Sequence, residues 1–192
     1  APIYGATSKL IYQSGGIYGR TVEWSATSGA GYPYEVQVAN NTTLNYPNTA
    51  GAAFSANLGI ATHLTIDSGS SLYMDYGGGA NKSGRLTIGG NLVNNGNFGL
   101  GSAVGGDLYL AGHWTKATGA NFYPNERQVV FNGSAQQDLT GATIFDYLKI
   151  DKSGSYVNLA ASSSITINKN IDFASRFINL GASSITLLSA AT

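Results

Sequence analysis

Few side chains in this 192-residue sequence could take part in catalysis, and their spacing matches no common catalytic pattern. Enzymes that cleave polysaccharides gather carboxylates, or a lysine or arginine base, on one exposed face. Asp67 and Asp151 each follow an apolar-x-Ile strand at the same register. We expect them to lie about 19 Å apart along a stack of strands, beyond the roughly 5–9.5 Å of a glycosidase pair. We therefore interpret both as turn residues.

A second grouping of charged residues is conceivable around two other aspartates. Asp138 and Asp146 could approach each other across one coil of the fold, beside Lys149 or Arg127. Such a grouping would place carboxylates beside a basic side chain, but we do not expect it to be catalytic. We expect no catalytic residues and no enzymatic activity.

The two histidines and the absence of cysteine argue against a tightly bound metal. His63 and His113 form no H-x-x-x-H or H-x-E pattern, and no thiolate is available. Calcium held by turn carbonyls and aspartates stays open as an alternative, although the G-G-x-G-x-D calcium repeat is missing. We expect no other cofactor.

The aromatic residues offer a different chemistry, because their rings can stack on sugars. The chain has twelve tyrosines and two tryptophans. The candidate ligand-binding residues are those that flank turns: Tyr32, Tyr34, Tyr73 and Tyr76. Ordinary packing and closure of an end cap is the competing interpretation, and the one we favour. We expect Trp114 in the core.

The elements that would position these residues are short strands that return at a regular distance. Apolar-x-apolar triplets, each followed by small or polar residues, recur at gaps of 17 to 28 residues. The triplets are Val36-Gln37-Val38, Leu64-Thr65-Ile66, Leu86-Thr87-Ile88, Leu108-Tyr109-Leu110, Val129-Val130-Phe131, Leu148-Lys149-Ile150, Ile165-Thr166-Ile167 and Ile185-Thr186-Leu187. No stretch shows helical periodicity, and the leucine-rich repeat frame is absent. The pattern predicts an all-β, right-handed parallel β-helix (β-solenoid) of about eight coils.

Alternation along each triplet predicts which side chains face inward. If the eight triplets stack as one row, their flanking residues would supply sixteen apolar core residues from one strand face alone. The middle residues would face outward, and Tyr109, Val130 and Lys149 would interrupt any flat threonine array of the kind that binds ice. We also expect Phe98 and Phe122 to stack inside the column.

The chain is expected to form one domain with two parts. Residues 1–34 are rich in glycine and aromatic residues and irregularly spaced, which predicts an N-terminal cap or an irregular first coil. Residues 35–192 would form the regular β-helix coils.

Composition excludes several classes of partner. Only 10% of residues are charged and the formal net charge is zero, so the basic stripe that nucleic acid requires is absent. Membrane insertion is not expected either, because no apolar run approaches about 20 residues. A surface of Ser, Thr, Asn, Gly and Tyr is more typical of a secreted or cell-surface protein than of a cytosolic enzyme.

One region resembles a known family. The pattern runs through Gly112-x-Trp114, Gly119-x-x-Phe122, Val129-x-Phe131-Asn132-Gly133-Ser134-x-x-Gln137-x-Leu139-x-Gly141, Phe145-x-x-Leu148-x-Ile150, Gly154 and Val157-x-Leu159. It resembles the β-helical repeat segments of very large secreted proteins of Bacteroidetes, over residues 112–173. The resemblance implies export by the type IX secretion system and a role as a surface adhesin or adhesin stalk.

These observations lead to a functional hypothesis with alternatives. We expect a non-enzymatic structural or adhesive segment of a secreted or cell-surface bacterial protein, with surface glycans or other cell-surface or secretion components as partners. One alternative is a carbohydrate-binding or polysaccharide-lyase-like β-helix. Others are an ice-binding solenoid and a filament subunit that self-associates end to end, which an uncapped coil at Ile185 to Leu188 would favour.

Overall fold

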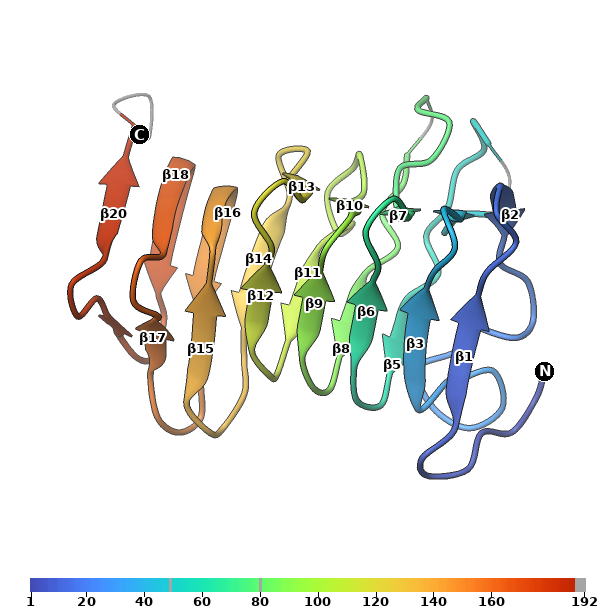
Figure 1. Ribbon diagram of the computed structural model, residues 1–192, viewed down its shortest axis with the longest axis horizontal. Coiled ribbons are helices and arrows are strands. Elements are labelled where there is room, and N and C mark those ends of the chain that lie inside the picture. The colour runs from blue at the N-terminus through green and yellow to red at the C-terminus, as the bar shows by residue number, and fades with distance from the viewer. Residues whose placement is uncertain (49, 80, 189–192) are drawn as a thin grey trace.

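The chain forms a right-handed parallel β-helix, seen from the side in Figure 1. The computed structural model describes residues 1–48, 50–79 and 81–188. Each coil runs up one face, crosses the upper edge and returns down the opposite face, so that successive coils stack from the N-terminal end to the C-terminal end (Figure 1). All paired strands among the described residues are parallel, as coil stacking requires. This confirms the predicted fold class.

Among the described residues, the first face is a sheet of eight strands, which gives eight coils. Its strands are β1 (Lys9–Tyr12), β3 (Glu35–Val38), β6 (Leu64–Ile66), β9 (Leu92–Asn94), β12 (Trp114–Lys116), β15 (Gln137–Thr140), β17 (Val157–Leu159) and β19 (Ile178–Asn179).

The second and third faces complete each coil. The second face has five strands, β2 (Ile17–Gly19), β4 (Thr43–Asn45), β7 (Ser71–Tyr73), β10 (Asn97–Gly99) and β13 (Asn121–Tyr123). The third face has seven strands, β5 (Leu58–Ile60), β8 (Leu86–Ile88), β11 (Leu108–Leu110), β14 (Gln128–Phe131), β16 (Ala142–Ile150), β18 (Ser164–Phe173) and β20 (Ser184–Leu187).

The apolar triplets build the core as their alternation predicts. Fourteen of the sixteen flanking residues are buried, and the two others belong to the last triplet. There Ile185 is half-buried and Leu187 is 59% exposed, because no described coil stacks beyond them. The stack of Phe98 on Phe122 is also confirmed, with ring centroids 5.8 Å apart. Trp114 is fully buried, as expected.

The prediction that all eight triplets form one row is wrong. The first two triplets lie on the first face and the other six lie in the sheet of the third face. Within that sheet the last two triplets are in register with the beginning of β16, not with Leu148-Lys149-Ile150. Thr65 is therefore in register with Val93, not with Thr87, whose neighbours are Gly59 and Tyr109. The apolar-x-apolar pattern occurs on both the first and the third face, for example in Leu64-Thr65-Ile66 and Leu86-Thr87-Ile88, so spacing alone does not distinguish the faces. The middle residues form no common ladder.

The coils become narrower between β13 and β16, at a step that we call the shoulder. On the wide side, the chain between Lys116 and Gln128 contains a turn and the separate strand β13. On the narrow side, Thr140 passes through Gly141 almost directly into the nine-residue strand β16. Gly141 has φ of +97°, and a Cβ there would collide with the Lys116 carbonyl. The second-face sheet therefore ends at β13, and coils beyond the shoulder have two long sides.

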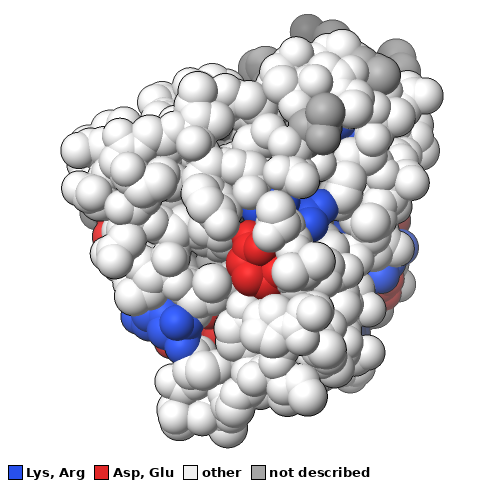
Figure 2. Space-filling view, turned by 90° about the vertical axis from the view of Figure 1, so that its right-hand side faces the viewer, with Lys and Arg blue, Asp and Glu red and all other residues white. Residues whose placement is uncertain are grey.

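The N-terminal end of the column is closed by aromatic side chains around a buried arginine. The Arg20 guanidinium lies 4.7 Å from the ring centroid of Phe54 and 5.4 Å from that of Tyr46. Trp24 is fully buried and donates its indole N–H to the carbonyl of Gly59 at 2.8 Å. Figure 2 looks onto this end and shows a mostly uncharged surface with a few charged side chains near its middle.

Candidate functional site

The four candidate tyrosines lie in two separate parts of the sequence and fold. Tyr32 and Tyr34 precede β3; the Tyr32 ring lies against Gly59, and the Tyr34 carbonyl accepts two hydrogen bonds from Thr62. Tyr73 ends β7 on the second face, and Tyr76 lies half-buried in the turn that follows. Sugar stacking by these residues stays a prediction.

Tyr73 has an aromatic neighbour that was not predicted. Its ring centroid is 6.1 Å from that of Tyr123, across Gly99 of the intervening coil. Beside this pair, the Asn125 amide donates to the Asp75 carboxylate at 3.0 Å. Burial raises the pKa of Asp75 above its ordinary value. The pair therefore combines two rings with a half-buried carboxylate, which is a combination that can bind a sugar.

Both histidines belong to a line of polar side chains that follows the rod axis along the first face. We call this line the axial ladder; it consists of His63, Asn91, His113, Asp138, Asn158 and Asn179. Its first three bonds each join a side chain to the backbone N–H of the next coil, at 2.8 to 2.9 Å. Its last two join neighbouring side chains, at 3.1 and 3.0 Å.

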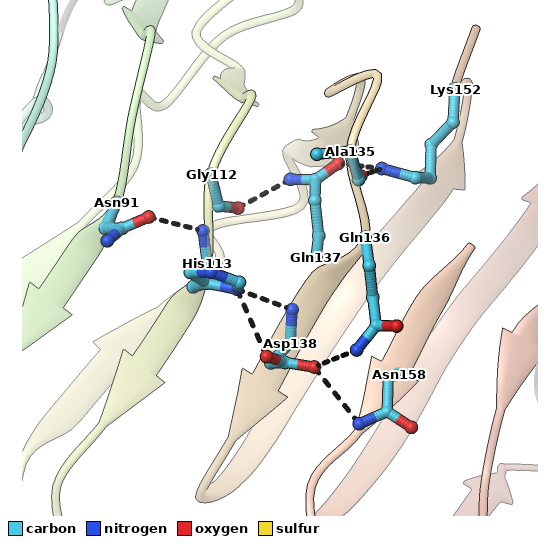
Figure 3. Close-up of polar contacts among 9 residues, drawn as sticks. All are labelled: Asn91, Gly112, His113, Ala135, Gln136, Gln137, Asp138, Lys152 and Asn158. Atoms are coloured by element: carbon cyan, nitrogen blue, oxygen red, sulfur yellow. Dashed lines mark hydrogen bonds and ion pairs between the residues drawn. The ribbon is translucent and has the colours of Figure 1, made fainter. Parts of the chain in front are cut away.

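The ladder determines the tautomer of His113. Its Nδ1 accepts the backbone N–H of Asp138 at 2.8 Å, so this nitrogen carries no proton and the ring proton is on Nε2. The Asp138 carboxylate, 3.4 Å from the same Nδ1, therefore receives no hydrogen bond from it. His113 and Asp138 resemble an acid–base dyad only in that their side chains lie close together. Their bonds connect coils, as Figure 3 shows.

The third face uses the same type of bond. The Asn57 side chain accepts the backbone N–H of Arg85 at 3.0 Å, and Asp107 accepts that of Gln128 at 2.9 Å. In both cases a polar side chain that immediately precedes one strand accepts a backbone N–H from the following coil. That N–H lies just before the neighbouring strand or at its first residue. We infer that the histidines and aspartates at these positions serve coil stacking.

Three successive coils are joined by a buried side-chain pair, Gln137 and Lys152, which we call the clasp (Figure 3). The Gln137 amide donates to the carbonyls of Leu110 and Gly112 at 2.9 and 2.6 Å. Its oxygen accepts the Gly133 N–H at 2.9 Å and the Lys152 ammonium at 2.6 Å. All four hydrogen-bonding positions of the amide are thus used.

Lys152 completes the clasp from the next coil. It is 2% exposed, and its ammonium donates to the carbonyls of Gly133 and Ala135 at 2.7 and 2.9 Å in addition to Gln137. Three acceptors match the three protons of an ammonium, which is the condition under which a buried lysine is tolerated. The clasp is therefore a structural element.

The clasp predicts a pH dependence of stability. Burial lowers the pKa of Lys152 from 10.5 to about 8. Between these values the unfolded chain binds a proton that the folded chain does not, so the contribution of Lys152 to stability rises with pH in this window. We expect the free energy of unfolding of the wild type, relative to Lys152→Met, to increase from pH 8 to pH 10 in urea denaturation. A difference independent of pH would contradict this.

The carboxylates considered for catalysis do not come together. Asp67 follows β6 on the first face and Asp151 follows β16 on the third, so the prediction that they share a register is wrong. Repetition of the apolar-x-Ile pattern on two faces explains the error.

The second grouping does not form either. Asp138 is held in the axial ladder, whereas the buried Asp146 accepts the Glu126 N–H and the Asn168 amide, each at 2.7 Å. Lys149 lies nearest to the carboxylates of Asp151 and Asp172, at 3.3 and 3.9 Å.

Two further features of the described residues bear on the class of site. Within residues 1–48, 50–79 and 81–188, no three His, Asp or Glu residues are grouped so as to hold a metal ion; calcium binding stays a prediction. Over the same ranges, no helix could cross a membrane.

No protein-family model, curated protein or solved structure matches this chain.

Proposed function

We propose that the chain is a non-enzymatic β-solenoid segment of a secreted or cell-surface bacterial protein, with a structural and adhesive role. The observation that supports this most strongly is the axial ladder. The side chains with the most reactive chemistry, His63, His113 and Asp138, are bonded to neighbouring coils. Groups used in this way stiffen a rod along its axis.

The clasp supports the same proposal. Lys152 is a lysine whose pKa is lowered by burial, a property often seen in catalytic lysines. Here the amine is enclosed and bonded to three acceptors, so that no substrate atom can reach it. The low content of charge, with 10% charged residues, fits an extracellular surface and agrees with the secreted or cell-surface location that we propose.

A second candidate function is binding of carbohydrate by the tyrosines. It is favoured by the contact between Tyr73 and Tyr123, of which Tyr123 is 42% exposed. Two neighbouring rings at the surface could stack on one face of a sugar, and the Asp75 carboxylate could accept a hydroxyl.

A glycan array combined with a cleavage assay tests the proposal. We expect residues 1–192 to bind some surface glycans and to release no product from any of them. Tyr73→Ala distinguishes the second candidate, and Tyr156→Ala is its control, because Tyr156 stacks on Phe177 away from this site. Loss of the array signal in Tyr73→Ala alone would assign binding to the tyrosine pair. Cleavage of any glycan would overturn the non-enzymatic role.

A further inference from the structure

The shoulder contains a surface cleft of about 390 Å³ between β13 and the beginning of β16. Its size lies in the range of sites for small ligands, about 300–1,000 Å³. Its lining includes Lys116, Phe122, Ile144, Ser164 and Thr166. The cleft exists because the coil beyond Gly141 is shorter than the coil before it.

The floor of the cleft is apolar and rigid. Phe122 is half-buried and packs edge-on against Trp114, with ring centroids 4.9 Å apart, and against Phe145 at 5.7 Å. Ile144 is 53% exposed at the side of the cleft. A flat apolar surface fixed by the core is suited to the C–H face of a sugar ring.

Backbone groups add hydrogen-bonding capacity to the walls. β13 is the last strand of its sheet, and the bonds made by Asn121 and Tyr123 show that these residues point toward β10. The N–H and C=O of Phe122 therefore point away from β10, toward the cleft. Ser164 and Thr166, two residues with hydroxyl groups, also line it.

The geometry excludes insertion of a whole β-strand into this space. On the other two faces the same coils are directly paired, β12 with β15 and β14 with β16. The coils thus remain one strand spacing apart, about 4.8 Å, which leaves no room for another strand between them. The cleft arises because one coil is shorter than the coil beside it. It therefore suits a compact ring better than an extended peptide.

The charge of the cleft lining indicates which class of ligand it would bind. Lys116 is the only ionisable residue lining the cleft, and among the described residues its ammonium has no hydrogen-bond or ion-pair partner. A half-buried cation without a counter-ion favours a ligand that carries a negative charge. The hydroxyls and the apolar floor favour a sugar.

The geometry points to a binding site for a carboxylated sugar, such as a uronate residue of an acidic oligosaccharide, in the shoulder cleft. The Lys116 ammonium pairs with the carboxylate, and the ring packs on Phe122 beside Ile144. The walls bond the sugar hydroxyls. This inference rests on the adhesive part of the proposed function and assigns it a site distinct from the tyrosine pair.

The test is a titration of residues 1–192 with trigalacturonate, followed by calorimetry and by NMR chemical shifts. The fully methyl-esterified trisaccharide is the matched neutral ligand. We expect the ester to bind at least about tenfold more weakly, and added salt to weaken binding of the acid. Lys116→Gln and Ile144→Glu should each reduce affinity by about the same factor. Lys169→Gln, a surface lysine paired with Glu126, should leave it unchanged.

Several outcomes would overturn the site. These are equal affinity for acid and ester, an unaltered affinity in Lys116→Gln, shifts confined to residues outside the cleft, or no binding at millimolar ligand. Preferential binding of an acetylated tripeptide with a free carboxylate would overturn the sugar class. Cleavage of the trisaccharide would overturn the proposed function instead, and leave the location of the site in place.

Discussion

Replacing Gln137 by leucine is expected to destabilise the protein by about 3–5 kcal/mol, because it disrupts a buried hydrogen-bonded network. The variant removes one acceptor of the Lys152 ammonium and leaves the Gly133 N–H and the Gly112 carbonyl without partners. The Leu110 carbonyl loses one of its two donors and keeps the N–H of Asn132. Each orphaned buried group costs about 1–3 kcal/mol. Urea denaturation followed by circular dichroism measures the change.

The neighbouring residue provides a matched control for the clasp. Gln136 is exposed, and its one side-chain hydrogen bond among the described residues is to Asp138, so Gln136→Leu should change stability by no more than about 0.5 kcal/mol. Combining Gln137→Leu with Lys152→Met should recover part of the loss, because the buried charge is then removed with its partner. A Gln137→Leu variant as stable as the wild type would refute the structural role of the clasp.

Replacing Trp114 by alanine should cost about 3–5 kcal/mol through the cavity that it leaves. The indole contacts Phe122, Phe131 and Phe145, with centroid distances of 4.9, 6.5 and 5.2 Å, and donates to the Thr143 hydroxyl at 3.1 Å. Thermal unfolding provides the measurement.

A less drastic replacement of Trp114 separates the contribution of its aromatic ring to stability from that of its hydrogen bond. Trp114→Phe keeps an aromatic ring in the core and loses the indole N–H, so it should be clearly less destabilising than Trp114→Ala. Because Phe122 is also the floor of the cleft, Trp114→Ala should weaken binding of trigalacturonate as well. Equal stability of the alanine and phenylalanine variants would show that the aromatic cluster contributes little.

The fold could be predicted from the sequence because its signal is local and repeated. A triplet such as Leu108-Tyr109-Leu110 places two side chains inward on any face of a solenoid, and the core follows from alternation alone. The assignment of triplets to faces could not be predicted, because the chain between triplets varies in length. Leu64 is followed on its own face by Leu92, not by Leu86.

The polar networks were missed for a different physical reason. Gln137 and Lys152 lie in segments rich in small and polar residues, where such side chains are usually solvated. Only the turn lengths bring them together inside the column. One signal was present: the segment Asn132-Gly133-Ser134-x-x-Gln137 allows the glutamine to return to the N–H of Gly133. The shoulder cleft had no local signal, because it results from a difference in length between two coils.

The most direct test of the central claim is a search for product released from every glycan that the chain retains. Retained glycans are incubated with residues 1–192 and analysed for new reducing ends and for unsaturated sugars. We expect all of them to be recovered intact, because His113, Asp138 and Lys152 are committed to bonds between coils. Product that appears with the wild type, and disappears in a folded Asp138→Asn variant, would contradict it.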